Sequence, residues 1–181
     1  MKLHLDVIST GDYQSTKKKY NLSRRLLELI FWIKFPALII ERSLLITKGI
    51  DLVKSVSQQN YAAVLFSVSY VDSVVLKSAF ESKSPSIKLR FKAIKALASQ
   101  NILPVKAFMP ILPYIVDTES DLEKVIKITA TSGGSFVLGG VLTLSGYQKE
   151  RYLGVTKEKF TNMLSRYEVL YRGNYGPTDD Y

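Results

Sequence analysis

The sequence predicts an α/β protein, namely a partial, open βα barrel with about five mostly parallel strands and helices on the outside. Short, compact apolar segments alternate with longer segments whose apolar residues recur at helical spacing. The strand-like segments follow one another at intervals of about 25 to 35 residues, as in βα units with right-handed crossovers. The chain has 181 residues, whereas a closed eight-stranded barrel takes about 250. The predicted sheet is therefore open.

Five segments have the patterns of strands. Residues 3–9 alternate apolar and polar side chains, and residues 37–41 (ALIIE) form the continuous apolar run of a buried parallel strand. The remaining predicted strands are residues 61–70, 104–111 and 135–144. Within the last of these, Gly139 and Gly140 indicate a bulge or a close approach of two backbones.

Helices are predicted between and after these strands. The helical segments are residues 18–35, 46–59, 74–84, 87–99, 118–132 and 157–171. Pro36 ends the first helix, and Gly49 weakens the start of the second. Ser86 is a predicted N-cap, and Thr118 is another, with Asp121 three residues later. We expect residues 1–146 to form the partial barrel, with residues 147–181 packed on it as a C-terminal helix and polar tail.

Composition excludes several kinds of site. The chain has no cysteine, which rules out disulfides, thiolate nucleophiles and cysteine-bound zinc or iron-sulfur sites on this polypeptide. His4 is the single histidine, so multi-histidine metal sites are also excluded. The formal charge of +9 favours polyanionic partners, and Lys17 to Lys19 with Arg24 and Arg25 suggest either a nucleic-acid contact or a solvated face.

The same sequence predicts a cytoplasmic protein with no membrane partner. Its first ten residues lack the continuous apolar core of a signal peptide. Residues 26–40 form the longest apolar stretch, but Glu28, Lys34 and Pro36 interrupt it, and it is shorter than the roughly 20 residues that span a bilayer.

Six segments, in order, resemble the spore photoproduct lyase-like branch of the radical SAM superfamily. They are TGDYQ (10–14) with YNLSRRLLE (20–28), PALIIERS (36–43), LITKGIDL (45–52), FSV (66–68), Glu81 with Pro85-Ser86 and Arg90, and MPILP (109–113) with Asp117. The first resembles the family's TDPYQ segment, the second its strand end pv.iiTKS, and the last its corner PiiPgiND. Each motif is short, so the order of all six carries the resemblance.

The resemblance implies S-adenosylmethionine as a cofactor, bound at the carboxyl ends of the strands. By resemblance, the cofactor-binding residues are Arg42, Ser43 and Ser67, and the candidates for a substrate cleft are Tyr13, Gln14, Glu81 and Arg90. A guanidinium at position 42 would pair with the methionyl carboxylate. Alternatives stay open: Arg42 pairing with Glu41, a structural Glu81–Arg90 pair across the Pro85 turn, and Tyr13 covering the core.

The chain also departs from the family. Three cysteines spaced C-x3-C-x2-C hold the family's [4Fe-4S] cluster, and none is present here, so the resemblance covers only the C-terminal part of the barrel and this chain does not ligate the cluster. Gly11 replaces the Asp of TDPYQ, Arg42 a Lys, Lys48-Gly49 an Arg-Asp pair, and Val116 the Asn of PiiPgiND. The loss of two acids and an amide suggests decay or repurposing.

Two hypotheses of function follow. In the first, the chain is half of a split radical SAM enzyme, inactive alone, and a cysteine-bearing N-terminal half chain docks on the strand at residues 3–9. In the second, it is a catalytically inactive remnant that serves as a basic nucleic-acid-binding or interaction module. The open sheet edge also predicts a homo-oligomer if no other partner covers it.

Overall fold

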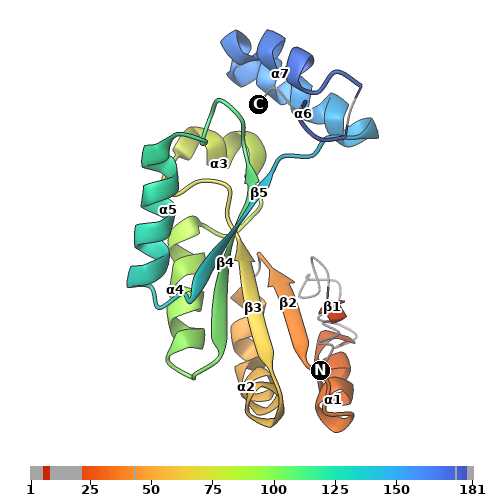
Figure 1. The fold of residues 1–181 in the computed structure, drawn as a ribbon, viewed down its shortest axis with the longest axis vertical. Coiled ribbons are helices and arrows are strands. Elements are labelled where there is room, and N and C mark those ends of the chain that lie inside the picture. Colours follow the sequence, from red (N-terminus) through yellow and green to blue (C-terminus); the bar gives the residue numbers. More distant parts are fainter. Residues whose placement is uncertain (1–5, 9–21, 43, 174, 179–181) are drawn as a thin grey trace.

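A computed structural model describes residues 6–8, 22–42, 44–173 and 175–178. Its sheet has five strands in the order β1 to β5, and every neighbouring pair is parallel. The strands are β1 (Asp6–Ile8), β2 (Ala37–Glu41), β3 (Ala62–Ser67), β4 (Leu103–Ile111) and β5 (Phe136–Val141). The sheet does not close, because β1 and β5 lie at its two ends (Figure 1). The predicted fold class is confirmed.

Helices connect the strands and continue after the last one. They are α1 (Leu22–Trp32), the 3-10 helix η2 (Leu44–Gly49), α2 (Ile50–Gln59), α3 (Val74–Phe80), α4 (Ile87–Ala98), α5 (Glu119–Thr131), α6 (Gly146–Lys159), the 3-10 helix η3 (Thr161–Met163) and α7 (Leu164–Leu170). Both predicted caps are present: Ser86 Oγ accepts a hydrogen bond from Leu89 N at 3.4 Å, and Thr118 Oγ1 accepts one from Asp121 N at 3.2 Å.

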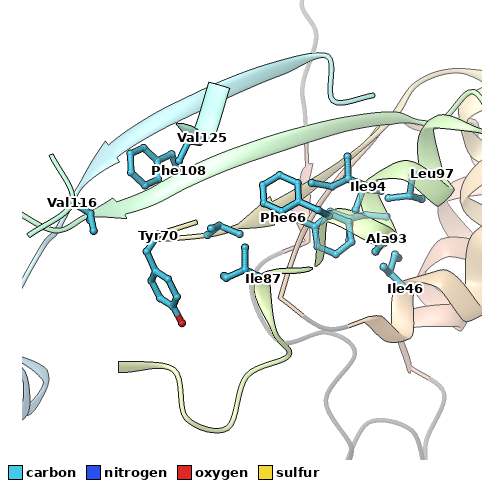
Figure 2. Packing of buried hydrophobic residues seen from close by; sticks show 14 of the residues in the cluster. Ile46, Phe66, Tyr70, Ile87, Ala93, Ile94, Leu97, Phe108, Val116 and Val125 are labelled. Carbon is cyan, nitrogen blue, oxygen red and sulfur yellow. The ribbon is translucent and has the colours of Figure 1, made fainter. Parts of the chain in front are cut away.

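The apolar side chains of the sheet divide between its two faces. Ile39, Val64 and Phe66 join buried helix residues such as Ile94 and Leu97 in the main core, part of which Figure 2 shows. A second, smaller cluster on the other face contains only strand residues among those described, with Leu65 and Val105 at its centre. Because β3 is buried on both faces, its sequence AAVLFS is apolar almost throughout.

The glycine pair in β5 lies at an irregularity of the sheet. The register between β4 and β5 shifts between Phe108 and Ile111. A Cβ added to Gly140 would lie 2.8 Å from Met109 Cγ, closer than ordinary packing allows. The register shift confirms the irregularity predicted at this glycine pair, whereas the close neighbour of Gly140 is the Met109 side chain and not a second backbone.

The prediction of a single C-terminal helix at residues 157–171 is wrong. Helix α6 begins at Gly146 and ends before Phe160, and η3 and α7 follow it. Sequence periodicity missed α6 because Tyr152 and Thr156 are its only buried residues. The predicted domain boundary at residue 146 stays a prediction.

Tyrosines attach α7 to the sheet, beyond the ends of β4 and β5 (Figure 1). Tyr167 Oη donates to the Pro113 carbonyl at 2.6 Å, and Tyr171 Oη donates to the Leu142 carbonyl at 2.7 Å. Tyr152 Oη in turn contacts Tyr167 Oη at 3.1 Å. These buried hydroxyls all have partners, as buried polar groups require.

None of the helices within the described ranges combines the length and the apolar character needed to cross a lipid bilayer.

Candidate functional site

The carboxyl ends of the parallel strands meet at one edge of the sheet, where α/β proteins place their ligands. Of the predicted site residues, Arg42 directly follows β2 and Ser67 is the last residue of β3. Ser43, Tyr13 and Gln14 lie outside the described residues. Of the predicted cofactor-binding residues, the described edge therefore contains the exposed Arg42 after β2 and the buried Ser67 at the end of β3.

Ser67 connects two strands at this edge. Its Oγ donates a hydrogen bond to the Met109 carbonyl of β4 at 2.6 Å. Its own carbonyl accepts a hydrogen bond from Arg90 Nη1 at 2.8 Å. The side-chain hydroxyl and the backbone carbonyl of Ser67 are thereby both fixed, so the end of β3 is held between β4 and α4.

Glu81 and Arg90 form a buried ion pair behind Ser67. Arg90 Nη2 lies 2.6 Å from Glu81 Oε2 and Nη1 lies 3.4 Å from Oε1, so the contact is two-pronged. Both side chains are buried in the described chain, and Arg90 is fully so. This geometry matches the alternative of a structural pair across the Pro85 turn. A role for either residue in a substrate cleft stays a prediction.

Tyr70 extends this network. Its Oη donates to Glu81 Oε2 at 3.4 Å. Burial raises the pKa of Tyr70 to about 12, and the negative charge of Glu81 adds to that effect. The phenol is therefore neutral at physiological pH and serves as a hydrogen-bond donor to the carboxylate.

Lys106 carries a buried amine that the sequence analysis did not identify. It lies on β4 opposite Phe66, fully buried, with Nζ 4.3 Å from the centre of the Phe91 ring. Within the described chain, neither Lys106 Nζ nor Arg90 Nε has a hydrogen-bond partner. Burial lowers the pKa of Lys106 to about 6, and Arg90 lowers it further while Glu81 opposes the shift. The signal in the sequence was a lysine at the centre of the apolar strand LPVKAFMPI.

Arg42 is exposed at the end of β2. Its backbone N–H donates to Glu41 Oε2 at 3.2 Å, and the Glu41 side chain itself is buried. An exposed guanidinium at this edge has the chemistry to bind a carboxylate in two-pronged fashion. The side chain therefore fits the role that the resemblance gives it toward the carboxylate of S-adenosylmethionine.

An iron-sulfur cluster does not fit this chain. Iron-sulfur clusters are held by cysteine thiolates, sometimes with histidine, and the sequence has no cysteine. Among the described residues there is also no group of three or more histidine, aspartate or glutamate side chains that could hold a metal ion. No chemistry of the cluster can be assigned to residues of this polypeptide.

No protein-family model matches the chain. It is 24% identical over 170 residues to uncharacterized proteins of Mycobacterium bovis and of two strains of Mycobacterium tuberculosis, an alignment that covers 93% of this chain. The same alignment covers 50% of each relative, so the chain spans about half the length of the relatives it matches.

One solved structure shows the fold of this chain. A spore photoproduct lyase variant with bound AdoMet and dinucleoside spore photoproduct matches 87% of this chain with a TM-score of 0.63 and 12% identity. The chain folds like part of spore photoproduct lyase. The match covers 46% of the lyase chain, so the partial barrel predicted from the spore photoproduct lyase-like motifs is confirmed at the level of the fold. Methylornithine synthase (PylB) matches 80% of this chain and 45% of its own, with 13% identity and a TM-score of 0.46.

Proposed function

We propose that this chain forms the S-adenosylmethionine-binding part of a radical SAM enzyme of the spore photoproduct lyase type. A second polypeptide segment, which carries the cluster cysteines, would complete the enzyme. The observation that carries the proposal is the fold similarity to a lyase structure that has AdoMet bound. The six ordered motifs of the sequence, two of which contain Arg42 and Ser67, support the same assignment.

The proposed binding edge comprises the ends of β2 and β3. Arg42 would bind the methionyl carboxylate through its guanidinium. The fixed strand end at Ser67, held by Arg90 and Met109, would present backbone groups of rigid geometry beside it. A preorganised edge loses little conformational entropy when a ligand binds, which favours affinity.

The test is the melting temperature of the purified chain across a range of S-adenosylmethionine concentrations. At a hundred times the dissociation constant, binding adds about 2.7 kcal/mol to the free energy of unfolding, or roughly 5 to 10 °C for a chain of this size. In the Arg42→Met variant the increase should be lost, whereas Lys95→Met on the exposed side of α4 should keep it. Failure of millimolar S-adenosylmethionine to raise the melting temperature would refute the proposal.

A second candidate function rests on the charge of the chain. Its 25 Lys and Arg against 16 Asp and Glu give a formal charge of +9, which favours binding to phosphate backbones. In this alternative the chain is a catalytically inactive, basic nucleic-acid-binding module. DNA binding whose affinity falls steeply with salt, without any response to S-adenosylmethionine, would favour it.

A further inference from the structure

Helix α1 has apolar side chains on two faces, although only one of them contacts the core. Leu27 and Ile30 are buried in the main core. Leu26, Leu29 and Ile33 are 40%, 50% and 49% exposed and form a second row along the same helix and its last turn. A helix that is apolar well beyond its core-facing stripe is normally covered on both sides.

The position of this second row follows from helical geometry. Arg24 marks the side of α1 that faces α2, because its Nη2 lies 3.3 Å from Asp51 Oδ2. At about 100° per residue, Leu26, Leu29 and Ile33 lie roughly 140° to 180° around the helix from Arg24. We call these three residues the outer stripe of α1. It faces away from α2, toward the flank where the row of helices ends.

The sheet ends on the same flank. Among the described strands, β1 pairs with β2 alone. Figure 1 shows β1 and α1 together at the end of the molecule beyond β2. An end strand offers backbone groups for an added strand, and the outer stripe offers an apolar surface for an added helix. A right-handed βα unit places its helix on the same face of the sheet as the neighbouring helices.

We infer that the outer stripe of α1 and the free edge of β1 together dock one βα unit of a partner polypeptide. The helix of that unit packs on Leu26, Leu29 and Ile33, and its strand pairs with β1. The lengths of the similar proteins support a βα unit of a partner as the occupant. This chain matches only 50% of the length of its mycobacterial relatives and 46% of the length of spore photoproduct lyase. That the docked unit carries the cluster cysteines rests on the proposed function.

The residues around the stripe indicate the character of the partner helix. Trp32 is 77% exposed next to the stripe, and Arg25 and Lys34 are also exposed. Tryptophan is enriched among the residues that contribute most to the binding energy of protein interfaces. The two exposed cations favour a partner helix with an apolar stripe and acidic residues beside it.

The experiment uses the part of the M. tuberculosis relative that lies outside its alignment with this chain, expressed as a separate polypeptide. Titration calorimetry, without S-adenosylmethionine, measures its binding to the purified chain. We expect a 1:1 complex in the micromolar range. The double variant Leu29→Glu with Ile33→Glu should weaken it at least tenfold, because it places two charges in the apolar contact.

Val74→Glu is the matched control, since Val74 is 83% exposed on α3, away from α1. It should leave the affinity unchanged, and circular dichroism should show all variants folded. The inference is overturned if no complex forms, if the double variant binds as tightly as the natural chain, or if sedimentation shows a homodimer that the double variant dissociates. The calorimetry contains no S-adenosylmethionine. If the complex forms but S-adenosylmethionine does not raise the melting temperature of the chain, the proposed function is refuted and the docking inference stands.

Discussion

Replacing Lys106 with methionine should stabilise the protein. Methionine has a similar length and no charge, so it can fill the space beside Phe91 without burying an amine that lacks a hydrogen-bond partner. The charged groups that act on Lys106 are Arg90 of α4, which disfavours its protonation, and Glu81, which favours it. The substitution removes the unpaired amine of Lys106 and leaves the ion pair between Arg90 and Glu81 in place.

The size of the effect follows from the pKa of Lys106. That pKa is lowered from 10.5 to about 6 in the folded chain. At pH 7.5 the folded lysine is neutral and the unfolded one is protonated, so folding must deprotonate it. Since pH 7.5 lies about three units below the unfolded pKa, this deprotonation lowers the free energy of unfolding by about 4 kcal/mol. Allowing for lost contacts of the amine with the Phe91 ring, we expect the free energy of unfolding to rise by about 2 to 4 kcal/mol.

The pKa of Lys106 also determines the direction in which the free energy of unfolding changes with pH. Between pH 6 and 10.5 the unfolded state binds more protons at this residue than the folded state does. The contribution of Lys106 to the free energy of unfolding therefore rises with pH, by about 1.4 kcal/mol per pH unit in this window, and is least favourable below pH 6. The Lys106→Met variant should lose this slope.

The assay is urea unfolding followed by circular dichroism at several pH values between 7 and 9, roughly within that window. Lys92→Met, which removes an exposed lysine from α4, the helix that contains Arg90 and Phe91, should change the free energy of unfolding by no more than about 0.5 kcal/mol. A Lys106→Met variant that is no more stable than the natural chain, or that keeps the same pH slope, would contradict the burial of an unpaired amine.

Four further substitutions test other parts of the structure. Glu81→Gln leaves the buried Arg90 without its charge partner and should lower the free energy of unfolding by about 3 to 5 kcal/mol in urea titrations; a loss below about 1 kcal/mol would show that the pair is solvated. Ser67→Ala removes the 2.6 Å bond to the Met109 carbonyl and should cost about 1 kcal/mol, seen as a lower melting temperature; an unchanged melting temperature would speak against that bond. Gly133→Ala should cost about 1 to 2 kcal/mol because Gly133 has φ +80° and a Cβ there would lie 2.9 Å from Ala98 Cβ. Gly154→Ala, in open space on α6, should instead stabilise by about 0.5 to 1 kcal/mol, and equal effects of the two substitutions would contradict the backbone argument.

The sequence predicted the elements whose residues follow one simple pattern. Residues 37–41 form β2 with the predicted bounds, because its residues alternate between the main core and the smaller cluster on the other face, and both need apolar side chains. Ser86 and Thr118 mark the beginnings of α4 and α5, because their side-chain oxygens satisfy backbone N–H groups that a helix leaves without partners. These features depend on neighbouring residues, so the sequence alone is enough to predict them.

Features that depend on distant parts of the chain were not predicted. Helix α6 has little periodicity because it packs through Tyr152 and Thr156 on a small area. The buried position of Lys106 depends on Phe91 and Arg90 of α4, which only the folded chain brings next to β4. The pairing of Glu81 with Arg90 was one of two alternatives, because spacing alone does not distinguish a buried pair from two residues that line a cleft.

The central claim is that the carboxyl edge of β2 and β3 binds S-adenosylmethionine, and the most direct test is to locate the ligand by NMR. Backbone amide resonances of the isotope-labelled chain would be followed during titration with S-adenosylmethionine. We expect the largest shifts at Glu41, Arg42, Ser67 and Val68, with little change at Ala62 and Leu103, where β3 and β4 begin. Shifts confined to the amino ends of the strands, or no shifts at saturating ligand, would contradict the claim.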